Sequence, residues 1–368
     1  MSNTGIPRVV ELGAGDHGRW EDYVRGHPLG LVYHHPLWLA TLVAESGTAP
    51  LTLAVEDGHR RLRGVMPMLR TRGLPGFRAE QIASPRLSSL PRTPIAGPLA
   101  DDDPTATLLV RAATARATAE GLRLEIKPSP DAPAGVSPAR LTAWRRTYVV
   151  DLPDDPDDMR FGEARNHARI RWAVKRAAKQ GIVIRAGSAA HDLRAWYRLY
   201  VLTLRRHGVP PRSLGFFRAL CAALEPRGLL RLQLAEQASD DHAVLVAGSL
   251  LLAFNTTVFY AYNGVSDEGL ALRANDALQW HALRDACREG FRRYDLGEVS
   301  ADNPGLAEFK RKWGSREVHL TRYHHPPVAG HADATARRRG LVPLIRRGWT
   351  RVPPAVTALA GRAIYRRL

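Results

Sequence analysis

Cysteine is scarce in this chain, with two residues, Cys221 and Cys287, among 368. Both stand in apolar stretches with helical spacing, so we expect buried free thiols and a reducing compartment. No cysteines and histidines have the spacing of a zinc site. A Tyr-His-His-Pro sequence occurs at residues 33–36 and again at 323–326, but adjacent histidines point different ways on a helix or strand. We therefore expect no metal.

Long apolar runs are also absent. No stretch reaches eighteen apolar residues, and the N-terminus has no charged segment followed by an apolar one. The sequence therefore predicts neither a membrane-spanning helix nor a signal peptide. We expect a cytoplasmic protein, with the inner face of the membrane as a second place of action.

Acidic residues are in short supply: 36 Asp and Glu stand against 53 Lys and Arg, for a formal net charge of +17. This surplus predicts a large anionic partner, which is nucleic acid, an anionic membrane surface or a phosphorylated substrate. Arginine outnumbers lysine, so a codon bias that puts arginine on the surface without a binding role is the alternative. A hydrophobic content of 45% in 368 residues is enough for two cores.

Four prolines between Pro128 and Pro138 mark the predicted break between two α/β domains of similar element order. We place the domains at residues 1–150 and 151–326, followed by a basic tail at 327–368. In the first domain the patterns predict these elements: helices at 36–45 and 105–120, a hairpin of 51–55 with 62–69, a loop at 74–104, and strands at 122–126 and 147–152.

The second domain opens with a basic helix at residues 165–180, whose apolar row is Ile170, Val174 and Ala177. No acidic residue occurs between Ala164 and His191. Spacings of four residues align the positive charges in rows, as a binding site for an anionic partner needs. The residues assigned to this site are Arg165, Arg169, Arg171, Lys175, Arg176 and Lys179.

The remaining elements alternate in the same way. We predict helices at 193–208, 213–224 (with Ser213 as N-cap) and 275–289 (with Asn275 as N-cap), and strands at 229–235, 244–254, 257–262, 293–296 and 317–323.

A short cationic helix is predicted at residues 305–314. Leu306, Phe309 and Trp313 recur at the spacing of one helical face. This face should be buried, with Lys310, Arg311 and Lys312 turned outward and Lys310 held between the two rings. A charge that packing holds in place can act on a reaction centre.

Several motifs carry a family resemblance: Leu-Tyr…Gly-Val-Pro at 199–210, Phe-Tyr-Ala-Tyr-Asn-Gly at 259–264, Asn…Leu-Gln-Trp at 275–280, Tyr-Asp-Leu-Gly at 294–297 and Gly-Leu…Phe-Lys-Arg-Lys-Trp-Gly at 305–314. Together they resemble the Fem family of aminoacyl-tRNA-dependent peptidyltransferases, most clearly over residues 160–323. The resemblance implies an α/β (α+β) fold of two tandem GNAT-like acyltransferase domains with mixed sheets flanked by helices. The uninterrupted helix at 165–180 predicts that the coiled-coil arm of some relatives is missing.

The resemblance also implies the chemistry. Lys310 matches the family lysine near the reacting ester, and Glu125 is the counterpart of a family acidic residue. Aminoacyl-tRNA is then the co-substrate, without a cofactor, and the second domain binds its acceptor end. The first domain holds the acceptor amine of a peptidoglycan precursor or a natural product. No Ser-His-Asp or Cys-His set stands out, which fits direct transfer.

Other site residues follow from the same reading. We assign Tyr260, Tyr262, Asn275, Phe309 and Trp313 to substrate binding, and Arg311 and Lys312 to tRNA. For the two tyrosines, packing in the core is an equal alternative, and for Lys310 it is a plain phosphate contact. The basic tail has three open uses, which are docking on the first domain, RNA binding and contact with anionic lipid.

Two other functions compete with aminoacyl transfer. The first is an acyl-CoA-dependent N-acyltransferase on the same fold, which needs glycines at a helix N-terminus to hold pyrophosphate. Residues 270–277 lack those glycines, which argues against CoA. The second is a non-catalytic binder of RNA or membrane, for which charge alone would suffice.

Overall fold

The computed structural model describes residues 6–74, 83–188, 190–238, 243–328 and 352–367. They form two compact units. Unit 1 holds the described residues up to Arg145, with 319–328 and 363–367, and unit 2 holds 146–318 and 352–362. The predicted tail between residues 329 and 351 lies outside the described residues. The mixed α/β class is confirmed.

Unit 1 begins with a strand and two helices, and its helices and strands are as follows: β1 (Arg8–Glu11), α1 (His17–Gly26), α2 (Pro36–Ser46), β2 (Pro50–Glu56), β3 (Leu62–Thr71), β4 (Arg86–Ser88), β5 (Leu99–Ala100), α4 (Asp103–Ala119) and β6 (Arg123–Ile126). The predicted helices and the hairpin are confirmed. The predicted loop at 74–104 contains the short strands β4 and β5.

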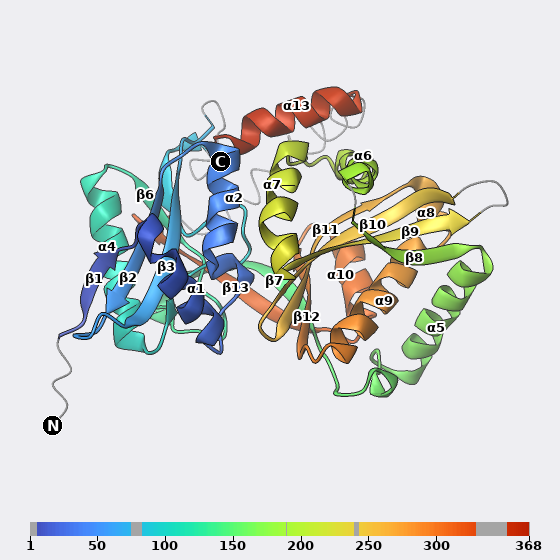
Figure 1. Ribbon diagram of the computed structural model, residues 1–368, viewed down its shortest axis with the longest axis horizontal. Helices are drawn as coiled ribbons and strands as arrows, with labels where there is room; N and C mark the ends of the chain where they lie inside the picture. Colours follow the sequence, from blue (N-terminus) through green and yellow to red (C-terminus); the bar gives the residue numbers. More distant parts are fainter. Residues whose placement is uncertain (1–5, 75–82, 189, 239–242, 329–351, 368) are drawn as a thin grey trace. The chain divides into compact units, whose positions relative to one another are not determined.

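The sheet of unit 1 has the order β1-β2-β3-β4-β6-β13, and β5 pairs with β3. Helix α4 covers one face and α1 and α2 cover the other (Figure 1). Alternate residues of β2 and β3, such as Leu53 and Met66, pack against Leu109 and Ala113 of α4. The strict alternation of β6 places Glu125 and its neighbours on opposite faces.

Unit 2 takes the chain from the middle of a long strand. Its helices and strands are β7 (Leu141–Asp151), α5 (Ala164–Lys179), β8 (Ile182–Gly187), α6 (Ala190–His207), α7 (Leu214–Leu224), β9 (Leu230–Ala238), β10 (Ala243–Phe254), β11 (Thr257–Val265), α8 (Asp267–Ala271), α9 (Ala274–Arg288), β12 (Arg293–Val299), α10 (Pro304–Arg311), β13 (Arg316–His325) and α13 (Pro354–Tyr365). The single helix α5, without a coiled-coil arm, is confirmed.

Strands β7 and β13 and helix α13 each have residues in both units. The division by contacts falls after Arg145, inside β7, whereas the sequence places it at residue 150. The end of β13 pairs with β6 at Tyr323, His324 and His325 and therefore belongs to unit 1. A proline-rich loop is the visible break in the sequence, but strand pairing decides which unit a strand joins.

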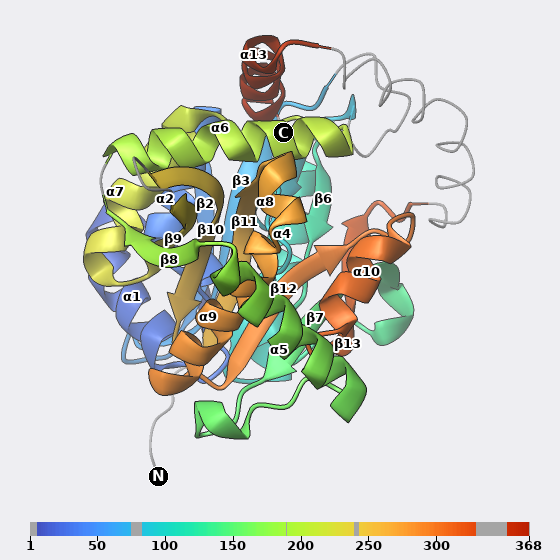
Figure 2. The same ribbon diagram turned by 90° about the vertical axis from the view of Figure 1, so that its right-hand side faces the viewer.

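The sheet of unit 2 has the order β7-β12-β11-β10-β9-β8. Helices α6 and α7 cover one face, and α9 with α5 beside it covers the other (Figures 1 and 2). Strands β11 and β12 run parallel but pair only from Thr257 to Phe259 and from Arg293 to Asp295. From Tyr260 and Leu296 onward β11 and β12 no longer pair with each other, so the two strands form a fork.

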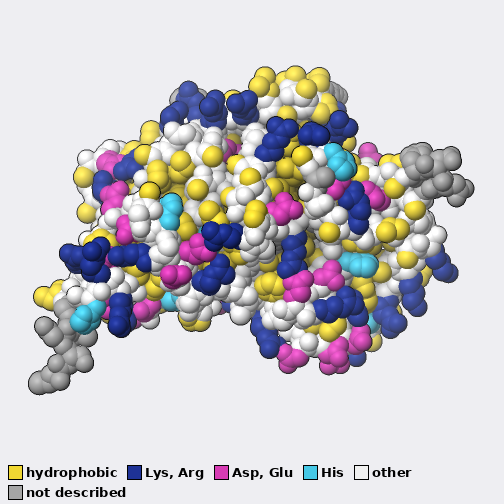
Figure 3. Space-filling view, in the orientation of Figure 1, with side chains coloured by type: hydrophobic (Ala, Val, Ile, Leu, Met, Phe, Trp, Pro, Cys, Tyr) yellow, Lys and Arg dark blue, Asp and Glu magenta, His cyan; other side chains and the backbone are white. Residues whose placement is uncertain are grey.

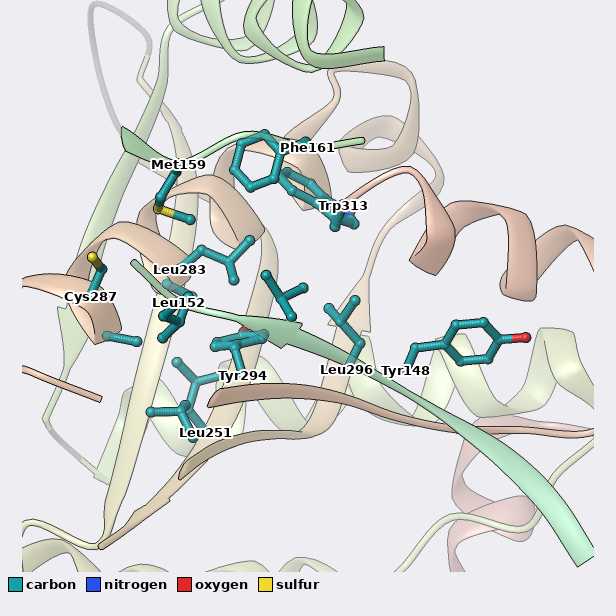
Figure 4. Close-up of a cluster of buried hydrophobic side chains, with 14 of the residues drawn as sticks. Tyr148, Leu152, Met159, Phe161, Leu251, Leu283, Cys287, Tyr294, Leu296 and Trp313 are labelled. Carbon is teal, nitrogen blue, oxygen red and sulfur yellow. The ribbon is translucent and has the colours of Figure 1, made fainter. Parts of the chain in front are cut away.

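The core of unit 2 lies between α9, β12 and the chain that precedes α5. Figure 4 shows Phe161 and Trp313 with their rings against each other, and their centroids are 5.2 Å apart. Tyr294, Leu296 and Leu283 belong to the same buried cluster. Trp313 anchors the segment after α10 in this core. Of the free thiols, Cys287 is buried here and Cys221 is half-buried.

One predicted helix boundary is wrong. Asn275 is not the N-cap of α9, because Arg273 holds that position with a left-handed backbone (φ +62°). Asn275 is the second residue of the helix, and its side-chain oxygen accepts a hydrogen bond from Asn263 Nδ2 at 3.3 Å. Ser213 caps α7 as predicted, since its hydroxyl accepts from the Phe216 amide at 3.1 Å.

Strand β11 packs closely on α6 at Gly264, and adding a side chain there tests this packing. A Cβ at this position would lie 2.5 Å from the Tyr200 nitrogen and 2.8 Å from the Leu199 carbonyl carbon, both backbone atoms. We expect Gly264→Ala to lower the free energy of unfolding by about 1–3 kcal/mol, since neither atom can move aside. Urea unfolding measures this. Gly215→Ala in α7, where the nearest atom is 3.6 Å away, is the control; equal losses in both variants would contradict the packing argument.

Candidate active site

Helix α10 carries the lysine that the sequence points to. The helix begins after Asn303, whose side-chain oxygen accepts a hydrogen bond from the Leu306 amide at 3.2 Å, with Pro304 at the first helical position. The residues that it buries are Ala307 and Lys310, whereas Leu306 is 38% exposed. The predicted buried face is therefore wrong in part. The small side chain of Ala307 faces the core, and Lys310 follows it one turn later.

Lys310 points into the protein. The residue is 5% exposed, and its Nζ donates hydrogen bonds to the Gly297 carbonyl oxygen at 2.8 Å and the Glu298 carbonyl oxygen at 3.4 Å. Gly297 has a left-handed backbone (φ +84°), and a Cβ there would lie 3.5 Å from Nζ. Both carbonyl groups belong to the part of β12 beyond the fork. The turn at Gly297 thus aims backbone oxygens at the ammonium.

Burial lowers the pKa of Lys310 to about 8, and the negative charges of Asp295 and Glu298 raise it by less than burial lowers it. Asp295 is itself buried, which raises the pKa of its carboxyl group, while hydrogen bonds from Thr147 and the Gly297 amide act in the opposite direction. Near neutral pH Lys310 therefore remains an ammonium whose charge water hardly screens.

The lysine that lies against the aromatic rings is Lys312, not Lys310. Its Nζ is 4.3 Å from the centroid of Phe309 and 5.5 Å from that of Trp313, and it pairs with the Asp276 carboxylate. The expectation that Lys310 sits between the rings is wrong. α10 ends at Arg311, so the chain turns there and Lys312 reaches back over Phe309.

The basic residues assigned to tRNA differ in their surroundings. Arg311 is exposed and donates to Glu317 at 2.5 Å, and Lys312 is half-buried on Asp276. The six cations of α5 are all exposed, and none forms an ion pair with another residue that the structure describes. The α5 surface is therefore the more available one for phosphate groups.

The other assigned side chains lie on both faces of the sheet. Phe309 and Tyr260 are half-buried against the core that holds Trp313. Tyr260 shares hydrogen bonds with Gln279 and Ser249, and burial raises the pKa of its hydroxyl group. Tyr262 instead packs against Phe217, with ring centroids 5.0 Å apart.

Three polar residues that contact or act on the assigned ones were not assigned from sequence: Asp276 pairs with Lys312, Gln279 bonds to Tyr260, and Asp295 acts on Lys310 through its charge. Gln279 is buried, and its Oε1 accepts a hydrogen bond from the Tyr294 hydroxyl at 3.0 Å. Asp276 and Gln279 stand one turn apart on α9. All three lie within the motifs at 275–280 and 294–297 that carry the family resemblance. The spacing of these motifs does not show which residues their side chains contact.

Glu125 lies in unit 1. Its Oε2 accepts a hydrogen bond from Ser88 at 3.0 Å and is 3.4 Å from Arg86 Nε. Burial alone would raise the pKa of this carboxyl group, but the charges of Lys127, Arg86 and Arg322 outweigh burial and hold it far below its usual range. Glu125 is therefore a permanent carboxylate among cations, and as a proton acceptor it is weak.

Helix α13 is docked on one side only. Thr357 and Gly361 are buried, and the latter lies close to the Pro211 backbone. The opposite side exposes Val356 (51%) and Leu359 (68%). Figure 3 shows yellow side chains at the top, where Figure 1 draws α13. No helix in the described part of the chain is both long and apolar enough to span a bilayer.

Comparisons with known proteins agree with this architecture. A family model described as an acetyltransferase (GNAT) domain matches residues 164–311. The UDP-N-acetylmuramoylpentapeptide-lysine N(6)-alanyltransferase of Weissella viridescens is 25% identical over 159 residues, which are 43% of this chain and 45% of that protein. The crystal structure of FemX matches with a TM-score of 0.65 and 16% identity over 85% of this chain and 96% of its own. The resemblance to the Fem family is confirmed.

A second solved structure shares the fold of this Fem-like chain. It is the C-terminal domain of a lysylphosphatidylglycerol synthetase from Agrobacterium fabrum, with a TM-score of 0.53 and 15% identity over 84% of this chain and 91% of its own. The chain spans less than half the length of the curated relative that it matches. The structural matches establish the fold, and the GNAT family model covers residues of unit 2.

The buried ammonium of Lys310 should make stability depend on pH. Its pKa is about 8 in the folded chain and ordinary, 10.5, in the unfolded one. Between these values the unfolded chain binds more protons, so the free energy of unfolding rises with pH. Relative to Lys310→Met, we expect wild type to gain roughly 2–3 kcal/mol between pH 7 and pH 10.

Urea unfolding of both proteins at fixed salt measures this difference. The control is Lys175→Met on the exposed face of α5, which removes a lysine that is not buried. A Lys310→Met difference that stays constant between pH 7 and pH 10 would show that the ammonium is not buried.

Proposed function

We propose that this protein is an aminoacyltransferase that forms an amide bond between an aminoacyl group from charged tRNA and an amine acceptor. The observation that carries the proposal is the Lys310 ammonium, which backbone carbonyl groups hold at the fork between β11 and β12. Aminoacyl-tRNA is the co-substrate, and the proposal includes no cofactor.

The reaction needs a stabilised oxyanion and a route for one proton. The acceptor nitrogen attacks the ester carbonyl carbon, the bond from that carbon to the ribose oxygen breaks, and the amine proton ends on the ribose oxygen. An ammonium has three N–H donors, and the carbonyl oxygens of Gly297 and Glu298 take two on Lys310. The third is the donor that we assign to the developing oxyanion. The neighbouring ribose hydroxyl relays the proton.

The acceptor is proposed from the relatives. The name of the Weissella viridescens protein states transfer of alanine to the lysine of a UDP-N-acetylmuramoylpentapeptide. We propose an amine of a peptidoglycan precursor for this chain, with a natural-product amine as the alternative. In this proposal residues 1–150 hold the acceptor and 151–326 hold the charged tRNA. Glu125 acts through its fixed negative charge and positions the cations around it.

An acyl-CoA-dependent N-acyltransferase is the second candidate, because the matching family model describes a GNAT acetyltransferase domain. Pyrophosphate would need the free amides at the N-terminus of α9. That turn already contains the buried Asp276 carboxylate, paired with Lys312, and Arg273 stands where a glycine would be needed. The turn therefore holds an ion pair and has no glycine that would let a phosphate group approach the backbone amides, which favours the aminoacyl ester.

Replacing Lys310 tests the proposed reaction. We expect Lys310→Ala to lower transfer from radiolabelled aminoacyl-tRNA about 10²–10³-fold, the usual loss for one oxyanion donor. Affinity for tRNA should stay within about threefold, because the ammonium is buried away from the exposed cations. Lys312→Ala, which removes a neighbouring lysine, is the control and should lose less transfer. Near-wild-type transfer by Lys310→Ala would refute its role, and discharge of acetyl-CoA by wild type would favour the second candidate.

We also propose that α13 touches anionic lipid at the inner face of the membrane. Its exposed side presents Val356 and Leu359 beside the exposed Arg362, Arg366 and Arg367. Apolar side chains flanked by arginine suit a lipid interface better than RNA. The other side of α13, with Thr357 and Gly361, is buried against the protein.

Vesicle binding tests this contact. We expect Val356→Glu with Leu359→Glu to weaken co-sedimentation with phosphatidylglycerol vesicles roughly tenfold, since two apolar side chains can no longer enter the lipid. Leu270→Glu, on the exposed side of α8, is the control and should bind as wild type does. Equal binding by all three proteins would exclude α13 as the contact.

A further inference from the structure

The geometry points to a single-stranded RNA contact on α5, in which Trp172 stacks on an unpaired base while the cations around it bind phosphate groups. This inference rests on the proposed function, because that function makes tRNA the partner. It assigns Trp172, for which the sequence predicted no role, and it adds base stacking to the ionic contacts of the cations.

Trp172 differs from the other tryptophans that the structure describes. It is 53% exposed, whereas four of the others are buried and two are half-buried: the buried ones are Trp20, Trp38, Trp196 and Trp313, and the half-buried ones are Trp144 and Trp280. Exposing so large an apolar side chain has no benefit for the fold of an isolated chain. A contact with a partner explains it.

The helix itself fixes the direction of the indole. Ile170, Ala173 and Ala177 form the buried face of α5, which packs along α9 (Figure 2). Trp172 stands on the opposite face, and the Arg176 guanidinium carbon is 5.2 Å from the centre of its ring. A guanidinium over one face of the indole holds the ring in place and adds a cation beside a stacked base.

The surroundings of the indole select RNA among the anionic partners. The chain has no acidic residue between Ala164 and His191, and all six cations of α5 are exposed. Figure 3 shows dark blue side chains along the lower right margin, where Figure 1 places α5. One indole among six cations is too little apolar surface for a membrane helix. An aromatic ring among cations is the usual composition of a single-strand binding surface.

The first turn of α5 is joined to the chain that follows α10. Asn166 Nδ2 donates hydrogen bonds to the carbonyl oxygen of Phe161, at 3.0 Å, and to that of Lys312. Trp172 follows Asn166 by six residues, which is about 9 Å along a helix axis, and it lies on another side of the helix. A strand that stacks on Trp172 therefore passes around α5 to reach α10. The acceptor end of tRNA carries the ester and has unpaired bases for this contact.

Filter binding with two RNA probes tests the inference. The probes are an uncharged minihelix with a four-nucleotide single-stranded 3′ end and the same helix with a blunt end. We expect Trp172→Ala to bind the tailed RNA roughly five- to hundredfold more weakly, the range for one stacked base, and the blunt RNA as wild type does. Trp172→Phe should recover most of the affinity.

The salt dependence separates stacking from charge. Trp172→Ala should keep the wild-type slope of log affinity against log salt, whereas Arg171→Gln with Lys175→Gln should lower the slope by about 0.7 for each lost contact with a single strand. Trp172→Ala should unfold at the wild-type urea concentration, because the side chain is exposed. Equal affinity of Trp172→Ala and wild type for tailed RNA overturns the inference. So does an equal loss on blunt RNA, or a loss confined to anionic vesicles.

These outcomes are independent of transfer activity, because uncharged RNA is the probe. RNA binding that depends on Trp172, in a protein that discharges no aminoacyl-tRNA, would refute the proposed function and leave the contact standing. Normal transfer by Trp172→Ala, with an unchanged KM for charged tRNA, would refute the contact and leave the function standing.

Discussion

One buried ammonium defines the candidate site of unit 2. Lys310 is accommodated because the turn at Gly297 presents two carbonyl oxygens, and because Asp295 lies nearby within the same fork of the sheet. A buried charge is costly unless hydrogen bonds and an opposite charge surround it. Here both are present, and they come from β12, which the core fixes on both sides. The charge is therefore held in one place, as stabilisation of an oxyanion requires.

Lys312, two residues after Lys310, has different contacts. Lys312 lies over Phe309 and closes a salt bridge with Asp276 at the N-terminus of α9. This pair joins the segment after α10 to α9. The cations of α5, by contrast, are exposed and form no ion pair with another described residue.

The family motifs gave the strongest information in the sequence. The segment from Gly305 to Gly314 and the motif around Tyr294 come together around Lys310, and the order of helices and strands is that of two GNAT-like units. These features are local. A helix is indicated by the spacing of its apolar residues and by its capping residues, and a strand by the alternation of apolar and polar residues. Such patterns are visible in one sequence, so α2, α4, α5 and the hairpin of β2 and β3 are predicted within a few residues.

The class of fold, the single helix α5 with its exposed positive charge and the choice of Lys310 as a candidate all follow from the sequence. The ring contact of Lys312, the pairing of Asp276 with it, the effect of Asp295 on Lys310 and the pairing of the end of β13 in unit 1 depend on the tertiary structure. The physical reason is that helical spacing fixes which residues share a face but not which face is buried. Burial depends on side chains that are distant in the sequence, such as Ala307 against the core and Lys310 against Gly297.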